Sequence, residues 1–139
     1  MRRGTTLVEQ LLILTLLGIL AAITAGAGAR LADAITVHAA ARDVADLFAL
    51  ARDNAVASGQ RTAVRLIDLS GRVVVHADTD TIARLDLAQR SLVHLTASRD
   101  SMAYASSGLG YGAANLRVIV SRGSAADTLT VSRLGRVRR

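Results

Sequence analysis

The hydrophobic pattern begins with a long uncharged run near the amino terminus. The run from Gln10 to Ala29 has no formal charge and is mostly aliphatic, and a short leader, Met1–Gly4, precedes it. At about 1.5 Å of rise per residue, a helix over this run matches the roughly 30 Å core of a bilayer. The pattern predicts a membrane-spanning helix. Because Arg2 and Arg3 lie before the run, the amino terminus is expected on the cytoplasmic side.

The same helix is expected to continue past the membrane as far as Ser58. From Leu31 to Ser58 the chain is rich in alanine and has no proline. Apolar residues recur there at three- and four-residue spacing and form one stripe, made by Val44, Leu47, Phe48, Ala51 and Ala55. Most charged residues fall on the other side. Gly59 can take the left-handed conformation that ends a helix, so one helix is predicted from Thr5 to Ser58.

Alternating apolar and polar residues then predict antiparallel strands. Residues 62–68 and 72–76 flank a turn and indicate one hairpin, and residues 116–121 and 128–132 indicate a second. Residues 91–96 also alternate and predict a strand. Residues 78–89 are expected to form a loop with room for a short strand. A long helix followed by antiparallel strands predicts an α+β fold in which the sheet covers one side of the helix.

These patterns divide the chain into four parts. With 139 residues, the chain is long enough for one modest domain. The chain has no cysteine, so no disulfide can form and no thiolate can bind a metal. The predicted parts are a leader at 1–4, the transmembrane half of the helix at 5–29, its amphipathic half at 30–58, and a β-rich head at 59–139.

The residues around the start of the apolar run form a recognisable motif. Gly4-Thr5-Thr6-Leu7-Val8-Glu9 resembles the processing site of type IV prepilins and type II secretion pseudopilins. The resemblance implies that a prepilin peptidase cleaves after Gly4 and methylates the new amino terminus at Thr5, where the family usually has Phe. It also implies that Glu9 is the acid that pairs with a neighbouring subunit's terminal amine during assembly. An ionisable residue at the edge of a membrane span is costly and therefore a functional candidate.

Two other interpretations of this amino-terminal segment remain open. Ala25-Gly26-Ala27 fits the cleavage site of an ordinary secretory signal peptide. The third interpretation is a single-span anchor that is never cleaved. A signal peptide gains nothing from the carboxylate of Glu9, whereas a helical assembly can pair it with a neighbour's terminal amine.

Two segments of the head extend the family resemblance. Residues 50–59 and 129–138 are similar to the helix end and the chain end of the GspH/FimT pseudopilins. The resemblance implies a long helix packed on β-strands and a subunit of a filament. The expected partners are prepilin peptidase, other pilins or pseudopilins, and the bacterial inner membrane, with the head on the periplasmic side.

Three functions follow from these interpretations. The first is a minor pseudopilin of a type II secretion system, which helps to export folded proteins. The alternative is a FimT-like minor type IV pilin that binds DNA during natural transformation. The second alternative, outside the family, is a membrane-anchored β domain that joins no filament.

Positive charge is concentrated at the carboxy terminus. The formal net charge of the chain is +6, and the segment from Leu116 onward has six Arg and one Asp. Its ending, Gly135-Arg136-Val137-Arg138-Arg139, resembles the G-R-x-R ending of FimT-type pilins, which also occurs in secretion pseudopilins. A short mobile tail of guanidinium groups can follow phosphates without reading bases. The candidate DNA-binding residues are Arg133, Arg136, Arg138 and Arg139.

The sequence shows no catalytic constellation. The glycine-rich run Gly108–Gly112 lacks the lysine of a P-loop, so residues 106–115 are expected to form a flexible loop. The acids Asp78, Asp80 and Asp86 lack the glycine and glutamate of an EF-hand. Structural roles are expected for the isolated histidines His38, His76 and His94. No enzyme activity, cofactor or metal site is expected.

Overall fold

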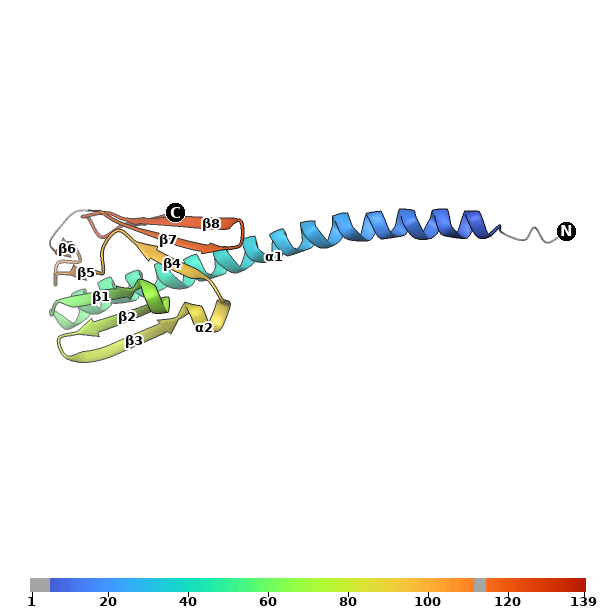
Figure 1. Cartoon of the computed structure of the whole chain (residues 1–139). Coiled ribbons are helices and arrows are strands. Elements are labelled where there is room, and N and C mark those ends of the chain that lie inside the picture. The colour runs from blue at the N-terminus through green and yellow to red at the C-terminus, as the bar shows by residue number, and fades with distance from the viewer. Residues whose placement is uncertain (1–5, 112–114) are drawn as a thin grey trace. The chain divides into compact units, whose positions relative to one another are not determined.

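The computed structural model describes residues 6–111 and 115–139 (Figure 1). Helix α1 (Leu7–Ser58) is followed by strand β1 (Thr62–Ile67), the short 3-10 helix η1 (Asp68–Ser70), β2 (Arg72–Ala77), β3 (Asp80–Asp86) and helix α2 (Leu87–Ser91). Then come β4 (His94–Ala97), β5 (Ser101–Tyr104), β6 (Gly110–Tyr111), β7 (Leu116–Arg122), β8 (Ala125–Val131) and β9 (Val137–Arg138). The chain divides into two compact units, Met1–Ala32 and Asp33–Arg139.

The described part of the first unit is an exposed apolar stretch of α1. The helix begins after Thr6, whose Oγ1 accepts a hydrogen bond from the backbone N of Glu9 at 3.3 Å. Such a side-chain acceptor satisfies one of the free N–H groups at a helix start. Residues 6–32 are all exposed, and by length and composition the helix is apolar enough to cross a membrane.

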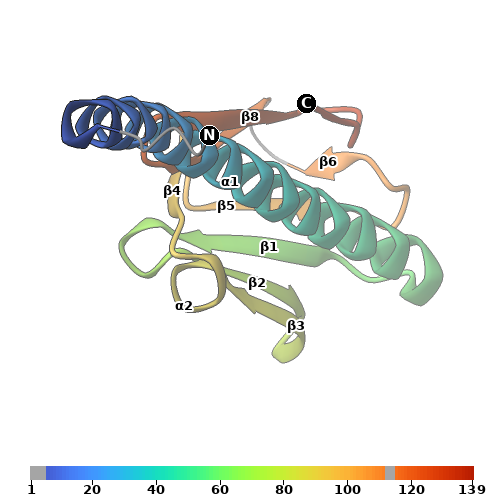
Figure 2. The ribbon, with the colours of Figure 1, turned by 90° about the vertical axis from the view of Figure 1, so that its right-hand side faces the viewer.

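The second unit, the head, contains two antiparallel sheets. The strand order is β3-β2-β1-β5-β6 in the first sheet and β4-β7-β8-β9 in the second. In Figure 2 the later part of α1 runs across the head, with β8 above it and β1 and β2 below it. The predicted α+β fold, one long helix packed on antiparallel strands, is confirmed.

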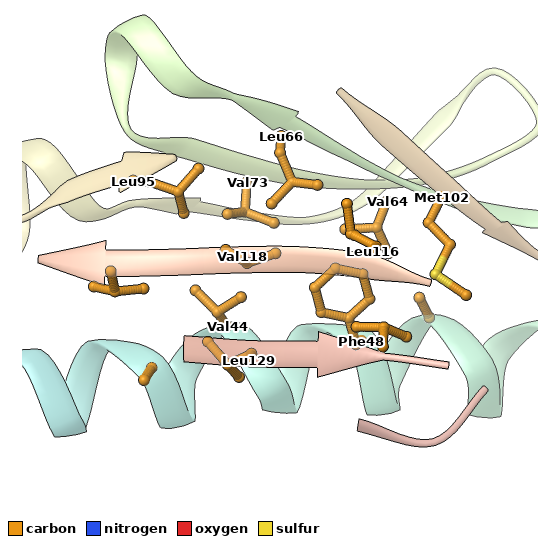
Figure 3. Close-up of a cluster of buried hydrophobic side chains, with 14 of the residues drawn as sticks. Val44, Phe48, Val64, Leu66, Val73, Leu95, Met102, Leu116, Val118 and Leu129 are labelled. Atoms are coloured by element: carbon orange, nitrogen blue, oxygen red, sulfur yellow. The ribbon is translucent and has the colours of Figure 1, made fainter. Parts of the chain in front are cut away.

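The core lies between the later part of α1 and the two sheets. Figure 3 shows Val44 and Phe48 directed from the helix toward the strand residues Val118 and Leu116. The buried helix residues are Val37, Ala40, Ala41, Val44, Phe48, Ala51 and Ala55. The predicted stripe is therefore confirmed from Val44 to Ala55, although Leu47 is only half-buried. The buried stripe also begins earlier than predicted, at Val37.

Both predicted hairpins are present. β1 pairs antiparallel with β2, and the connection ends at Gly71 with φ of 58°. β7 pairs antiparallel with β8 across a turn that contains Gly123, with φ of 55°. Helix α1 ends at Ser58 as predicted, and Gly59 has φ of 69°, the left-handed value that glycine adopts at little cost.

The loop expected at residues 78–89 is mostly regular structure. Residues 80–86 form β3, which pairs with β2 at the edge of the first sheet. Asp86 then caps α2, because its Oδ1 accepts a hydrogen bond from the backbone N of Gln89 at 3.1 Å. The strand predicted at 91–96 begins later, at His94, because α2 extends to Ser91. Strand β5 was not predicted, and β6 lies within the expected loop at 106–115.

The carboxy-terminal tail belongs to the second sheet, so the expectation of a mobile tail is wrong. Gly135, with φ of 75°, donates its backbone N–H to the carbonyl of Ser132 at 2.9 Å. A tight turn followed by a left-handed glycine is a common hairpin connection. The turn reverses the chain, and β9 pairs with β8, with Arg138 opposite Thr130 and Val137 opposite Val131.

Candidate functional site

The predicted processing residues Gly4 and Thr5 lie outside the described residues, and their roles stay predictions. Glu9 lies in the first turn of α1 and is exposed. Its carboxylate forms no ion pair with any residue that the structure describes. Thr6 and Glu9 have the spacing of a capping box, in which an acid three residues after the cap also supports the helix start. A test of an assembly role for Glu9 must therefore separate its charge from its capping geometry.

Arg139 is held by a charged cluster on the surface of the head. Its Nη2 lies 2.6 Å from Oδ2 of Asp127 in β8 and 2.9 Å from Nδ1 of His38 in α1. The same His38 nitrogen lies 2.9 Å from Oδ2 of Asp127. Burial acts to raise the pKa of Asp127, but hydrogen bonds from Arg139 and His38 outweigh it and lower that pKa. The cluster ties the chain end to both the helix and the sheet.

A second arginine of the basic segment also has internal partners. Nε of Arg122 lies 3.0 Å from Oδ1 of Asp33 in α1, and its Nη1 donates to the carbonyl of Ser91 at 3.1 Å. Arg122 therefore joins α1, α2 and β7. It is a structural residue of the head and does not extend the basic surface.

Four arginines of this segment form an exposed set, here called the basic surface: Arg117, Arg133, Arg136 and Arg138. None of their guanidinium groups forms an ion pair within the described ranges. The sheet register places Arg117 of β7 opposite Thr130, which is opposite Arg138 of β9. Residues opposite one another share a face of the sheet, and two strand spacings are about 10 Å. Arg117 and Arg138 therefore lie in one row on the outer face of the second sheet.

The sequence patterns missed the cluster of His38, Asp127 and Arg139. His38 is separated from Arg139 by 101 positions along the chain, and no periodicity brings them together. One signal was present, because Asp127 is the only acid after Leu116 among six Arg. A lone acid in a basic segment is a natural counter-ion for one of its neighbours.

The other residues weighed for metal binding are dispersed. His76 in β2 has Nδ1 at 3.3 Å from Oγ1 of Thr81, and His94 lies on β4. Within the described ranges, no three or more His, Asp or Glu residues come together in a way that could hold a metal ion.

The family described as type II transport protein GspH matches residues 40–135. A search of curated proteins gave no match. The matched range covers the buried stripe of α1 from Ala40 onward, all of the first sheet, and strands β4, β7 and β8 of the second sheet, and it ends at Gly135 before β9.

Solved structures with the same fold include a minor pilin and a minor pseudopilin. A crystal structure of the type IV minor pilin FimU from Pseudomonas aeruginosa (strain PAO1) has a TM-score of 0.63 at 12% identity, covering 73% of this chain and 86% of that chain. A second FimU crystal form has a TM-score of 0.61 at 12% identity, covering 73% and 90%. The minor pseudopilin EpsH from the type 2 secretion system of Vibrio cholerae has a TM-score of 0.58 at 16% identity, covering 73% and 94%.

The two kinds of comparison carry different weight. At these identities the structural likeness shows the fold, which is that of a type IV pilin-like protein. The family match covers more than half of the chain and is made on sequence. This chain therefore belongs to the GspH family, the family of minor pseudopilins and minor type IV pilins.

Proposed function

We propose that this protein is a minor pseudopilin of a type II secretion system, a structural subunit of an envelope-spanning pseudopilus that helps to export folded proteins. The observation that carries the proposal is the match of residues 40–135 to the GspH family of type II transport proteins. The internal ion pairs of Arg122 and Arg139 agree with it. They give two of the six carboxy-terminal arginines acidic partners within the head, so fewer of these arginines are left to bind an external anion such as DNA.

The first half of α1 supplies the membrane anchor in this proposal. It is exposed along its whole described length and apolar, which suits contact with lipid or with the helices of other subunits. The subunit crosses the inner membrane once, with its amino terminus in the cytoplasm and its head in the periplasm. This orientation rests on Arg2 and Arg3 before the span.

Processing at Gly4 is part of the same proposal. Prepilin peptidase cleaves after Gly4, because this small residue lets the enzyme approach the backbone. The enzyme then methylates the new amino terminus at Thr5. The intact mass of membrane-extracted protein should show the loss of Met1–Gly4 and the gain of one methyl group. Gly4→Leu should leave a full-length chain. Loss of everything through Ala27 would instead show an ordinary signal peptide.

Deletion of the gene tests the secretion function in the organism of origin. Without the subunit, substrates of the type II secretion system should accumulate inside the cell, and the wild-type gene should restore their export. A natural-transformation assay on the same strains serves as the comparison. Normal export together with a loss of DNA uptake would overturn the secretion proposal.

The basic surface favours a second candidate function, a FimT-like minor type IV pilin that binds DNA. Arg133, Arg136 and Arg138 are exposed, and they form no ion pair within the described ranges. Arg117 lies in one row with Arg138. Arg139 is expected to contribute less to DNA binding, because the carboxylate of Asp127 already neutralises its charge.

Salt dependence of binding by the full chain in detergent tests this second candidate. Arg136→Gln together with Arg138→Gln should lower the slope of log K against log salt by about 0.7–0.9 for each lost phosphate contact. The control is Arg84→Gln, which removes an exposed charge on β3 of the first sheet, outside the basic surface. No DNA binding at low salt, or equal slopes in all variants, would remove the DNA function.

A further inference from the structure

A groove separates the later part of α1 from the last residues of the chain. Its volume is about 550 Å³, and its walls come from Ala45–Asp53 on the helix and Gly135–Arg138 at the chain end. The whole groove lies within the head, the unit Asp33–Arg139. β9 is the edge strand of the second sheet, so the groove runs along a sheet edge.

The backbone N–H and C=O groups of Val137 face outward from this sheet edge. Ser132 donates its backbone N–H to the carbonyl of Arg136 at 2.9 Å, and these two residues form the first bonded pair of the β8–β9 ladder. In an antiparallel ladder, bonded and non-bonded pairs alternate. Val131 and Val137 are therefore a non-bonded pair, and the N–H and C=O of Val137 face away from β8. Neither group has a partner among the residues that the structure describes.

The helix wall of the groove leaves room for an extended peptide segment. Ala45 and Ala49 are one helical turn apart, so they share a face and present only methyl groups to the groove. Asp46 and Asp53 are exposed beside them. Within the described ranges, neither acid forms an ion pair with the arginines of the opposite wall, so the two walls do not close on each other.

The positive charges of Arg136 and Arg138 at β9 favour acidic side chains in any strand that binds in the groove. Val137 packs partly against the core, so Arg136 and Arg138 on either side of it share the outer face of the strand. A strand added to β9 would place every second side chain beside these arginines, where acids are favourable and bases unfavourable. Its alternate side chains would face Ala45 and Ala49, where small apolar groups fit.

We propose that this groove receives an extended segment of a neighbouring filament subunit, which adds as a strand to the free edge of β9. The segment alternates acidic residues, which lie beside Arg136 and Arg138, with small apolar residues, which lie over Ala45 and Ala49. Backbone bonds to Val137 supply affinity and the alternation supplies specificity, as in other strand additions. The identity of the occupant as a subunit rests on the proposed function.

The probe for the groove is a synthetic peptide that alternates valine and glutamate, added to the full chain in detergent. It should bind and slow the hydrogen exchange of the Val137 amide. Ala49→Leu should weaken binding by about tenfold or more, because the larger side chain fills the groove. Ala57→Leu is the matched control, since Ala57 is exposed on the same helix but not on the groove wall, and it should change nothing.

Two further probes separate strand pairing from charge attraction. A peptide alternating valine and lysine should bind only after Arg136→Glu and Arg138→Glu are made together. The glutamate peptide with N-methylated backbone should fail to bind, because it cannot donate to the strand edge. Equal binding of the methylated peptide, or unchanged Val137 exchange, would overturn the proposal.

A photo-cross-linker at position 49 tests the occupant in the cell, with position 57 as the control. An adduct with another filament subunit from position 49 alone supports the proposal. If the chain co-purifies with pseudopilins but position 49 gives no adduct, the groove proposal is overturned and the proposed function stands. If no pseudopilin co-purifies, the proposed function fails, and the peptide measurements alone decide whether the groove binds a strand.

Discussion

Tyr104 is buried, and its hydroxyl has no hydrogen-bond partner among the described residues. Burial raises the pKa of Tyr104 to about 12, and the positive charge of Arg52 opposes this only in part. The pKa in the unfolded chain is about 10, so the folded state holds the proton more tightly. The raised pKa therefore adds to the free energy of unfolding. This contribution is fully present below about pH 10 and is lost as the pH rises toward about 12.

Tyr104→Phe tests this account of a buried hydroxyl. The free energy of unfolding at neutral pH should stay equal or rise by about 1–3 kcal/mol, because an unsatisfied polar group is removed. The decline in stability above about pH 10 should become smaller. Urea unfolding at a series of pH values measures both effects, with Tyr111→Phe, an exposed tyrosine, as the control. A large loss of stability at neutral pH would show that the hydroxyl has a partner.

Gly135 combines a conformational and a steric requirement. Its φ is 75°, and a Cβ at this position would lie 2.6 Å from the carbonyl oxygen of Gly108. Gly59 has a similar φ of 69°, but a Cβ there meets nothing within 4 Å. We expect Gly59→Ala to cost about 1 kcal/mol from backbone strain alone. Gly135→Ala should cost clearly more, because backbone must also move. Equal losses in urea unfolding would show that the chain end is not packed as described.

The stability of the head should also depend on acid through Asp127. The pKa of Asp127 is lowered in the folded state, so its contribution is present above the unfolded pKa, about 3.9, and is lost as the pH falls through the folded value. Asp127→Asn should remove this part of the acid sensitivity. Urea midpoints between about pH 2 and 6 measure it. An unchanged acid profile would mean that Arg139 and His38 do not hold the carboxylate in solution.

At the scale of elements, strong periodicity was enough for prediction. The α1 stripe and the β1–β2 and β7–β8 hairpins were predictable because their apolar spacing matches their burial. β3 is an edge strand with no buried residue, so its sequence has no clear alternation. β9 has only two residues, and the turn at Gly135 determines its pairing, which strand patterns do not detect.

Packing between α1 and the sheets gives a prediction about fragments. A fragment that starts at Leu31 keeps the whole buried stripe and both sheets, so it should be soluble and unfold cooperatively. A fragment that starts at Gln60 should aggregate or stay unfolded, because the sheets would expose their apolar faces. Circular dichroism during urea unfolding distinguishes the two. If the shorter fragment folds equally well, the helix does not complete the core.

In the fragment that starts at Leu31, Phe48→Ala tests the contribution of a single helix side chain to the core. Phe48 is fully buried against both sheets. Its loss should cost about 3–5 kcal/mol. Val56→Ala, at an exposed position of the same helix, should have little effect.

For the whole molecule, the family match and the resemblance to a prepilin processing site come from separate parts of the chain. The processing motif at Gly4–Glu9 lies outside the matched range of residues 40–135, so neither finding depends on the other. The sequence predicted the family and the fold because the motif is local and the helix is periodic. It did not predict the ion pairs that Arg122 and Arg139 form within the head, because these pairs join residues far apart in the chain.

The proposed function requires that this chain joins a pseudopilus and that Glu9 supports its assembly. In lipid, pairing with a neighbour's terminal amine would be screened little. The most direct measurement is purification of the tagged full chain from membranes of its organism, followed by identification of bound pilins. The wild type should retain pseudopilins of the type II system. Glu9→Leu and Glu9→Gln should both insert but lose them, and the Gln variant keeps a capping-box residue while removing the charge. Normal retention by both variants, or no pseudopilin with the wild type, would contradict this account.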